Sequence, residues 1–234
     1  MDNFEPQIVF EDNHLLVVIK PKNISVQEDD SHDLDMLTLL KNFIKERDNK
    51  PGNVYLGLVH RLDRPTGGVM VFAKTSKCAD RLSQQLRDRQ IRKKYLCVVK
   101  GIPNQIDGTL VAYLKKNTDT NTVSLTTQSD KDGKYAELFY EVLGSENGYS
   151  LVKVDLHTGR SHQIRVQMAK QNKTPIYGDF KYGEKDHGGN LGLWAYELSF
   201  LHPISKKNMS FKVYPSTETA PFDMFKSTID FKNI

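Results

Sequence analysis

The chain of 234 residues contains only two cysteines, Cys78 and Cys97, which are too far apart in sequence to form a metal-binding pair. So few cysteines argue against a disulfide framework, and we expect both thiols to be reduced. Apolar runs are short as well: the longest one near the N-terminus covers residues 15–19, far below the roughly 20 residues that cross a membrane. The opening MDNFEPQ has no basic segment followed by an apolar core. We therefore expect no secretory signal, no membrane partner and a cytoplasmic location.

The sequence also lacks the short motifs that mark several enzyme classes. It has no GxxxxGK[ST] loop and no GxGxxG that opens a helix, so we expect no nucleotide cofactor. It has no GxSxG nucleophile motif. His60 lies near Asp63, and His157 lies near His162, but neither pair has a recognised metal-ligand spacing. We therefore expect no metal.

Positive charge is unevenly distributed along the chain. The net charge of +4 permits a nucleic-acid partner without requiring one. Residues 81–100, however, carry a single acidic residue, Asp88, and seven basic ones: Arg81, Arg87, Arg89, Arg92, Lys93, Lys94 and Lys100. Such an excess can bind a polyanion, although a solvated helix face is its more common origin.

Hydrophobic periodicity predicts more strands than helices. The runs 8–10 and 15–19 predict a hairpin, and residues 109–155 predict an antiparallel meander that ends in a turn at 145–148. Helices are expected over 34–47, 76–90 and 162–170, and further strands over 54–59, 69–73, 95–99, 191–201 and 208–214. Because strands and helices do not alternate, we expect an α+β fold with a largely antiparallel or mixed central sheet, flanking helices and a catalytic cleft. One domain over residues 1–234 is expected, with two lobes as a variant of it.

The segment HRLDRPTGG, residues 60–68, is a charged turn between two expected strands. Its ordinary interpretation is an Asx-type turn at Asp63 with a weak surface ion pair to a neighbouring arginine. If Leu62 points into the core, however, Arg61 and Asp63 share the opposite face. An arginine and a carboxylate presented together on a turn that contains Pro65 can equally serve as a catalytic pair.

Two further segments are rich in hydrogen-bond donors. In HTGRSHQIR, residues 157–165, Ser161 is the expected N-cap, and the polar residues Arg160, His162, Gln163 and Arg165 gather at a helix start. This cluster suits phosphate or carboxylate recognition, and an ordinary capped helix is the alternative. In RKKYLCVV, residues 92–99, three basic residues precede Tyr95, which is either a core or rim aromatic or a platform for a base.

Six segments together resemble the RluA-type pseudouridine synthase family, and they occur in the family's order along nearly the whole chain. They are IVFEDNHLLVVIKP (8–21), GLVHRLDRPTGGVMVFAKT (57–75), IRKKYLCVVKG (91–101), LHTGRSHQIRVQMA (156–169), PIYGDFKYG (175–183) and LGLWAYELSFLHP (191–203). The resemblance implies the pseudouridine synthase fold and the conversion of uridine to pseudouridine in ribosomal or transfer RNA. It also implies that neither a metal nor an organic cofactor takes part.

The resemblance also assigns roles to individual residues. It implies that Asp63 is the essential carboxylate, that Tyr95 stacks on the target uracil and that Arg165 pairs with Asp63. It implies that Arg61 helps to keep the target base extruded and that Leu193 forms part of the apolar wall around it. Whether Asp63 adds to C1′ or removes a 2′ proton stays open. Further candidates for binding RNA are His60, Arg64, Arg92, Lys93, Lys94, Arg160, His162 and Gln163.

The sequence departs from the family pattern at two positions, and three other functions are the alternatives to the one implied. Gly67 stands where the family commonly has Ser, and Trp194 stands where it commonly has His. We also expect no S4 RNA-binding domain, because the first motif begins at residue 8, and we expect a monomer. The rivals are a non-catalytic RNA-binding protein, a small-substrate glycosidase, which would need a second carboxylate, and a metal-dependent nuclease.

Overall fold

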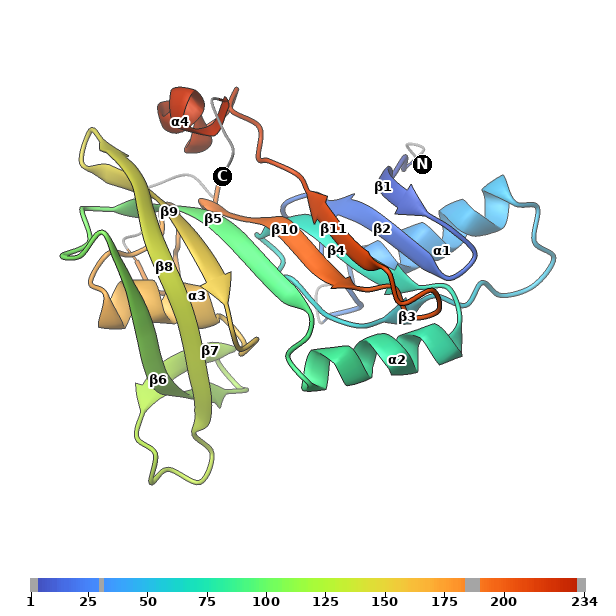
Figure 1. The fold of residues 1–234 in the computed structure, drawn as a ribbon, viewed down its shortest axis with the longest axis horizontal. Helices are drawn as coiled ribbons and strands as arrows, with labels where there is room; N and C mark the ends of the chain where they lie inside the picture. Colours follow the sequence, from blue (N-terminus) through green and yellow to red (C-terminus); the bar gives the residue numbers. More distant parts are fainter. Residues whose placement is uncertain (1–3, 30–31, 184–189, 231–234) are drawn as a thin grey trace. The chain divides into compact units, whose positions relative to one another are not determined.

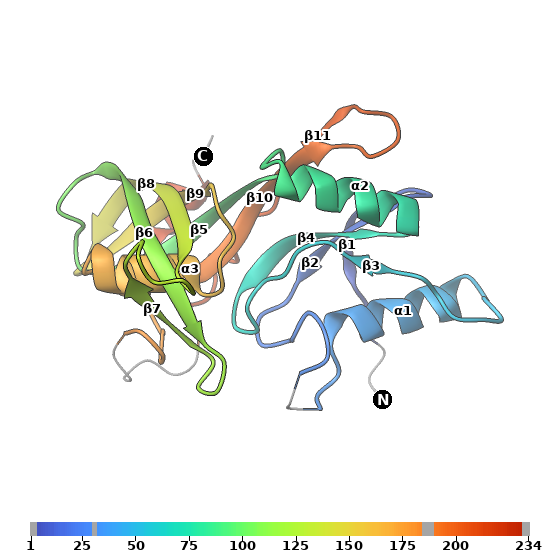
Figure 2. The same ribbon diagram turned by 90° about the horizontal axis from the view of Figure 1, so that it is seen from below.

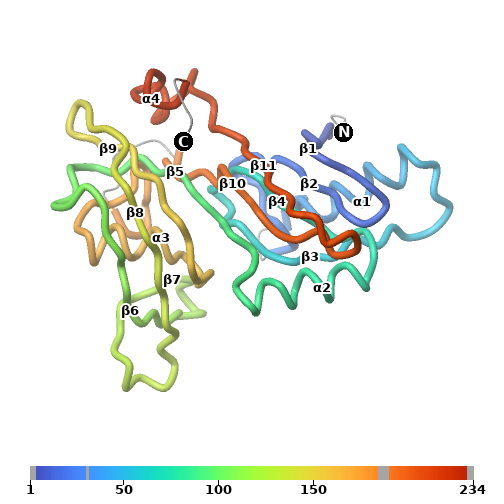
Figure 3. Tube along the Cα trace, in the orientation of Figure 1, coloured from blue at the N-terminus to red at the C-terminus, as the bar shows by residue number. Residues whose placement is uncertain are grey.

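The computed structural model describes residues 4–29, 32–183 and 190–230 of the chain. Two compact units make up the fold: Met1–Ile91 with Glu197–Val213, and Arg92–Tyr196 with Tyr214–Ile234. Figures 1 and 3 follow the chain through both units by colour. No helix in the described part of the chain is long and apolar enough to span a membrane.

The first unit is a sheet with one helix on each face (Figure 2). Its strands follow the order β1 (Gln7–Glu11), β2 (Leu15–Lys20), β4 (Gly67–Ala73) and β10 (Leu193–Leu201), whose residues from Glu197 onward belong to this unit. β11 (Asn208–Lys212) pairs with β10, and the two-residue β3 (Gly57–Leu58) pairs with β4. The helices are α1 (Met36–Arg47) and α2 (Ser76–Arg87).

The alternation of side chains in β2 explains the two helical layers. Leu15 and Val17 belong to one buried cluster with Cys78 and Leu82 of α2. The residues between them along the strand point to the other face of the sheet. On that face α1 buries an apolar stripe at helical spacing, which consists of Met36, Leu40 and Ile44. Each fully buried side chain of this size contributes roughly 1.5–3 kcal/mol of hydrophobic stabilisation.

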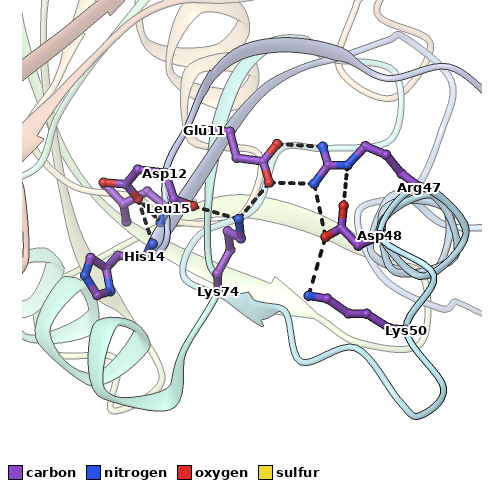
Figure 4. A network of polar contacts seen from close by, with 8 residues as sticks. All are labelled: Glu11, Asp12, His14, Leu15, Arg47, Asp48, Lys50 and Lys74. Carbon is purple, nitrogen blue, oxygen red and sulfur yellow. Dashed lines mark hydrogen bonds and ion pairs between the residues drawn. The ribbon is translucent and has the colours of Figure 1, made fainter.

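A network of ion pairs joins the hairpin β1–β2 to α1 and to the end of β4 (Figure 4). The Glu11 carboxylate accepts hydrogen bonds from Arg47 Nη1 and Nη2 at 2.7 and 2.8 Å and from Lys74 Nζ at 2.7 Å. These contacts, above all the one with Arg47, lower the pKa of Glu11 to about 2. Asp12 closes the hairpin turn by accepting from the backbone N–H groups of His14 and Leu15, both at 2.7 Å.

The second unit is an antiparallel sheet with short helices. The part of β10 before Glu197 is followed by β5 (Arg92–Lys100), β9 (Tyr149–Leu156), β8 (Lys134–Glu146), β6 (Asp107–Asn117) and β7 (Thr122–Thr126). A four-residue α3 (Gln163–Val166) continues as a π-helical turn (Gln167–Gln171). Near the C-terminus a 3₁₀ turn (Phe222–Phe225) and α4 (Lys226–Asp230) place Phe222, Phe225 and Ile229 in one cluster with Leu96, Val98 and Leu151.

Most of the expected elements are confirmed. The structure is α+β with a large sheet. Neighbouring strands run antiparallel in the pairs β1–β2, β2–β4, β5–β9 and β8–β9. The hairpin at the N-terminus is present, and α1, α2, β4, β5, β10 and β11 lie within a few residues of their expected bounds. The turn between β8 and β9 contains Asn147 and Gly148 at positive φ, as tight hairpins require. Both cysteines are free and buried.

Three local predictions are wrong, each because tertiary neighbours decide the outcome. A strand is expected over 54–59, but only the two residues of β3 pair with β4. One edge of β4 is fully paired with β2, and β10 is the neighbour of β4 on its opposite edge, so little of β4 is left for a further strand. Residues 109–155 do not form a simple meander, since β8 returns to pair with β6 rather than with β7. The helix expected over 162–170 is α-helical for four residues only, and its N-cap is His162 in the left-handed conformation rather than Ser161.

Candidate active site

In the first unit the charged turn presents its side chains as the alternation predicted. Leu62 is buried, Arg61 is exposed, and Asp63 is half-buried. The Thr66 N–H donates to the Asp63 carbonyl over 2.9 Å, which closes the turn. The backbone therefore holds Asp63 at a fixed point directly before β4, and Arg61 shares its solvent-facing side.

Lys20 is a buried residue that supports this turn through a hydrogen bond to its backbone, and it was not identified from the sequence. The side chain is fully buried, and its Nζ donates to the carbonyl oxygens of Pro21 at 2.8 Å and Arg64 at 3.1 Å. Burial lowers the pKa of Lys20 to about 7, and the negative charge of Asp63 opposes this shift. The available signal was a lysine placed directly after five apolar residues, at the end of a central strand.

Two other residues of the turn have contacts that hold the fold. Arg64 forms an ion pair with Asp33, lies 3.9 Å from Asp29, and donates from Nε to the Asn23 carbonyl at 3.3 Å. It therefore fastens the segment that follows β2 to the turn. His60 is buried, and its Nε2 accepts from the N–H of Val71 at 3.2 Å. The assignment of both residues to RNA binding stays a prediction, and these contacts favour a supporting role.

In the second unit Tyr95 lies near the start of the central strand β5. It is 6% exposed and pairs in register with Val154 of β9. Because side chains alternate along a strand, Lys93 and Cys97 share its face of β5, and Arg92 and Lys94 point to the other face. Leu193, the first residue of β10, is buried. Arg92 is exposed, whereas Lys93 and Lys94 are half-buried.

Arg165 of α3 is held by a buried carboxylate that the sequence did not reveal. Its Nε and Nη2 donate to the two carboxylate oxygens of Asp179 at 2.8 and 2.7 Å, and its guanidinium lies 5.2 Å from the ring centroid of Tyr182. Asp179 also accepts from the N–H of Lys181 at 3.0 Å. The segment PIYGDFKYG thus contains the residue that orients Arg165. The pairing of Arg165 with Asp63 stays a prediction.

A chain of glutamines fixes α3, which has no side-chain cap. Thr158 Oγ1 donates to Gln163 Oε1 at 2.8 Å, Gln163 Nε2 donates to Gln167 at 3.0 Å, and Gln167 Nε2 donates to Gln171 at 3.2 Å. The same amides reach backbone carbonyls of β8 and β6, namely those of Glu137, Leu110 and Val111. Gln163 is therefore buried inside this chain of contacts, and its expected contact with RNA stays a prediction.

The remaining basic residues divide between structure and surface. Arg81 donates to the Pro203 carbonyl at 2.8 Å, and Arg87 contacts Gln84 within α2. Arg160 is exposed and donates from Nε to the Tyr135 carbonyl at 2.8 Å, and His162 Nδ1 lies 2.6 Å from the Tyr182 hydroxyl. Residues 4–29, 32–183 and 190–230 hold no group of three or more His, Cys, Asp or Glu placed to bind a metal ion.

The sequence model of the RNA pseudouridylate synthase family matches residues 14–170 of this chain. The chain belongs to this family. Ribosomal large subunit pseudouridine synthase C of Buchnera aphidicola subsp. Baizongia pistaciae is 32% identical over an alignment of 240 positions, which covers 99% of this chain and 71% of that protein. Ribosomal large subunit pseudouridine synthase D of Zymomonas mobilis subsp. mobilis is 34% identical over an alignment of 217 positions, which covers 88% of this chain and 68% of that protein.

Solved structures show the same fold. Human RNA pseudouridylate synthase domain containing 4 superposes with a TM-score of 0.77 at 22% identity, and the match covers 96% of this chain and 93% of that one. The expected pseudouridine synthase fold is therefore confirmed, and so is the resemblance to RluA-type enzymes. The protein is an isomerase that acts on uridine in RNA.

Proposed function

We propose that the enzyme converts specific uridines of large-subunit ribosomal RNA to pseudouridine and that Asp63 is the residue on which turnover depends. The names of its relatives support the ribosomal target, and transfer RNA is the alternative that the assay includes. The observation that carries the site assignment is the turn itself. Its backbone, the buried Lys20 ammonium and the buried Leu62 hold Asp63 half-exposed beside Arg61.

The reaction sets two demands that these residues can meet. The N1–C1′ bond of the uridine must break, the base must turn, and a C5–C1′ bond must form, while C5 loses its proton and N1 takes one up. A base in a folded RNA is not accessible, so the enzyme must extrude it at a cost of a few kcal/mol. The exposed Arg61 offers a guanidinium that can fill the vacated stack or bind a phosphate, which offsets part of this cost.

Each remaining residue has one proposed task. The Asp63 carboxylate either adds to C1′ or removes a proton from C2′, and both routes require the ionised group. Tyr95 supplies an aromatic face for the uracil, and Leu193 supplies apolar surface. Arg165 is a positioning residue for Asp63, and its own orientation is fixed by the two hydrogen bonds that it donates to the Asp179 carboxylate. The proposed mechanism uses neither a metal nor an organic cofactor.

Pseudouridine mapping in cells that lack the protein tests the function. Complementation with the wild type should restore pseudouridine at one or more sites in large-subunit ribosomal RNA, and complementation with Asp63→Asn should restore it at none. Asp80→Asn, on the exposed face of α2, is the control and should behave as the wild type. Purified Asp63→Asn should still bind the RNA, because phosphate contacts dominate affinity. Restoration by Asp63→Asn would refute the assignment. Sites found in transfer RNA alone would overturn the ribosomal target but not the activity, and turnover that stops in excess chelator would favour metal-dependent chemistry.

A further inference from the structure

Lys93 stands out among the described cations of the second unit because it is partly buried and no described residue supplies an acceptor. It lies on β5 two residues before Tyr95, so the two side chains share one face of the strand. Among the residues that the structure describes, no carboxylate, carbonyl or hydroxyl pairs with its Nζ. Burial lowers the pKa of Lys93, and no neighbouring charge counteracts that shift. Lysines are rarely buried without a partner, because the desolvation of the ammonium is costly.

The ammonium of Lys93 lies against the turn that leads into α3. A Cβ added at Gly159 would come within 2.9 Å of Lys93 Nζ, so the ammonium lies directly against this glycine. The next residue is the exposed Arg160, whose Nε is fastened to the Tyr135 carbonyl. Two cations therefore flank one glycine on the surface of a single unit.

Glu137 lies beside the turn, because its carbonyl accepts from the Thr158 N–H, and its carboxylate is already engaged. This carboxylate accepts from the Tyr135 hydroxyl at 2.7 Å and lies 3.1 Å from His157 Nδ1. Thr158, which precedes Gly159, is buried and donates to Gln163. The turn is thus held by its own contacts, which do not use the Lys93 ammonium.

We propose that Lys93 and Arg160, on either side of Gly159, bind one backbone phosphate of the RNA next to the target uridine. This inference rests on the proposed function. A phosphate suits the chemistry of the two groups, since its oxygens accept charge-assisted hydrogen bonds from an ammonium and a guanidinium together. It also suits the location, because Lys93 shares one face of β5 with Tyr95, the proposed platform for the target uracil. The contact fixes the register of the RNA and carries no base specificity.

The first test measures RNA affinity against salt in the Asp63→Asn background, where no turnover occurs. The probe is an in vitro transcript of large-subunit ribosomal RNA. Lys93→Gln should weaken binding roughly tenfold, as the loss of one charged hydrogen bond does. It should also reduce the slope of log Kd against log salt by about 0.7–0.9, the value for one phosphate. Lys93→Arg should retain the slope. Lys116→Gln, which removes an exposed lysine of β6 in the same unit, is the matched control.

The second test locates the phosphate with short RNAs centred on a mapped uridine. Each carries a single neutral methylphosphonate at a different position. At one position the methylphosphonate should cost the wild type more affinity than it costs Lys93→Gln, in which Arg160 alone still contacts the phosphate. With the active enzyme, Lys93→Gln should raise KM more than it lowers kcat. The emission of Trp194, the single tryptophan, and circular dichroism verify that each variant is folded.

An unchanged salt slope in folded Lys93→Gln, an equal loss in Lys116→Gln, or additive losses at every methylphosphonate would each overturn the phosphate site. These outcomes are separate from a failure of the proposed function, because the binding test needs no turnover. A wild type that shows the Lys93-dependent slope but forms no pseudouridine would refute the function and leave the phosphate site standing.

Discussion

The buried pair of Arg165 and Asp179 should dominate the stability of the segment that carries Arg165. In Asp179→Asn the amide oxygen can still accept from one Arg165 nitrogen and from the Lys181 N–H. The new amide nitrogen, however, would face a donor, Arg165 Nε, across a contact that is now 2.8 Å. One charge-assisted hydrogen bond is lost, and a buried guanidinium, 5% exposed for the residue, loses its neutralising charge. Breaking such a pair costs about 3–5 kcal/mol. Since other contacts of Arg165 remain, we expect about 3 kcal/mol.

Urea unfolding followed by Trp194 fluorescence measures this loss, because the single tryptophan lies in the same unit. For a chain of this size, about 3 kcal/mol corresponds to a fall in Tm of roughly 6–12 °C. Asp119→Asn, an exposed acidic residue of the same unit, is the control and should shift neither value. The double variant Arg165→Met/Asp179→Asn should lose much less than the sum of the single variants. If Asp179→Asn unfolds at the same urea concentration as the wild type, the ion pair does not hold α3.

Two further predictions concern pH. The pKa of Lys20 is about 7 in the folded protein and 10.5 in the unfolded chain, so between these pH values the unfolded state binds more protons. The free energy of unfolding should therefore rise with pH over this window, by at most about 5 kcal/mol. Urea titrations at pH 7 and 10 should show a larger rise in the wild type than in Lys20→Met, in which Lys22 and Lys93, whose pKa values burial also lowers, still contribute. A rise of equal size in the two proteins would contradict the assignment. The lowered pKa of Glu11, about 2 against 4.5, has the opposite sign: its contribution is present above pH 4.5 and is lost as the pH falls towards 2. Because the network is partly exposed, Glu11→Gln should remove only about 1 kcal/mol at pH 7, and a loss that is equally large at pH 2 would contradict this origin.

The parts of the fold that follow from local pattern could be predicted from sequence. The strands β2, β4 and β5 are apolar runs, and the stripe of α1 has helical spacing, so their burial follows from periodicity alone. The exposure of Arg61 and the burial of Leu62 follow from the same alternation at the charged turn. In these cases one segment contains all the information that its conformation requires.

Tertiary partners decide what the sequence could not show. Lys20 and Asp179 are charged residues that become buried only because carbonyl groups or an arginine from distant segments receive them. A glutamine such as Gln167 reads as a surface residue of an amphipathic helix, yet its amide lies between two neighbours and the Leu110 carbonyl. Burial of a polar group depends on a partner, and a single sequence does not name the partner.

The path of the chain through the first unit has a consequence for its synthesis. The cluster that contains Leu15, Val71 and Leu82 is completed by Leu198 and Phe200, which the ribosome adds more than a hundred residues later. While the intervening residues are being made, the nascent N-terminal segment exposes the apolar side chains that later cover β10. Domains usually fold as they emerge, and exposed apolar surface promotes aggregation. We expect the nascent N-terminal segment to need protection by chaperones until β10 and β11 have left the ribosome, and truncation before residue 197 to yield an insoluble product.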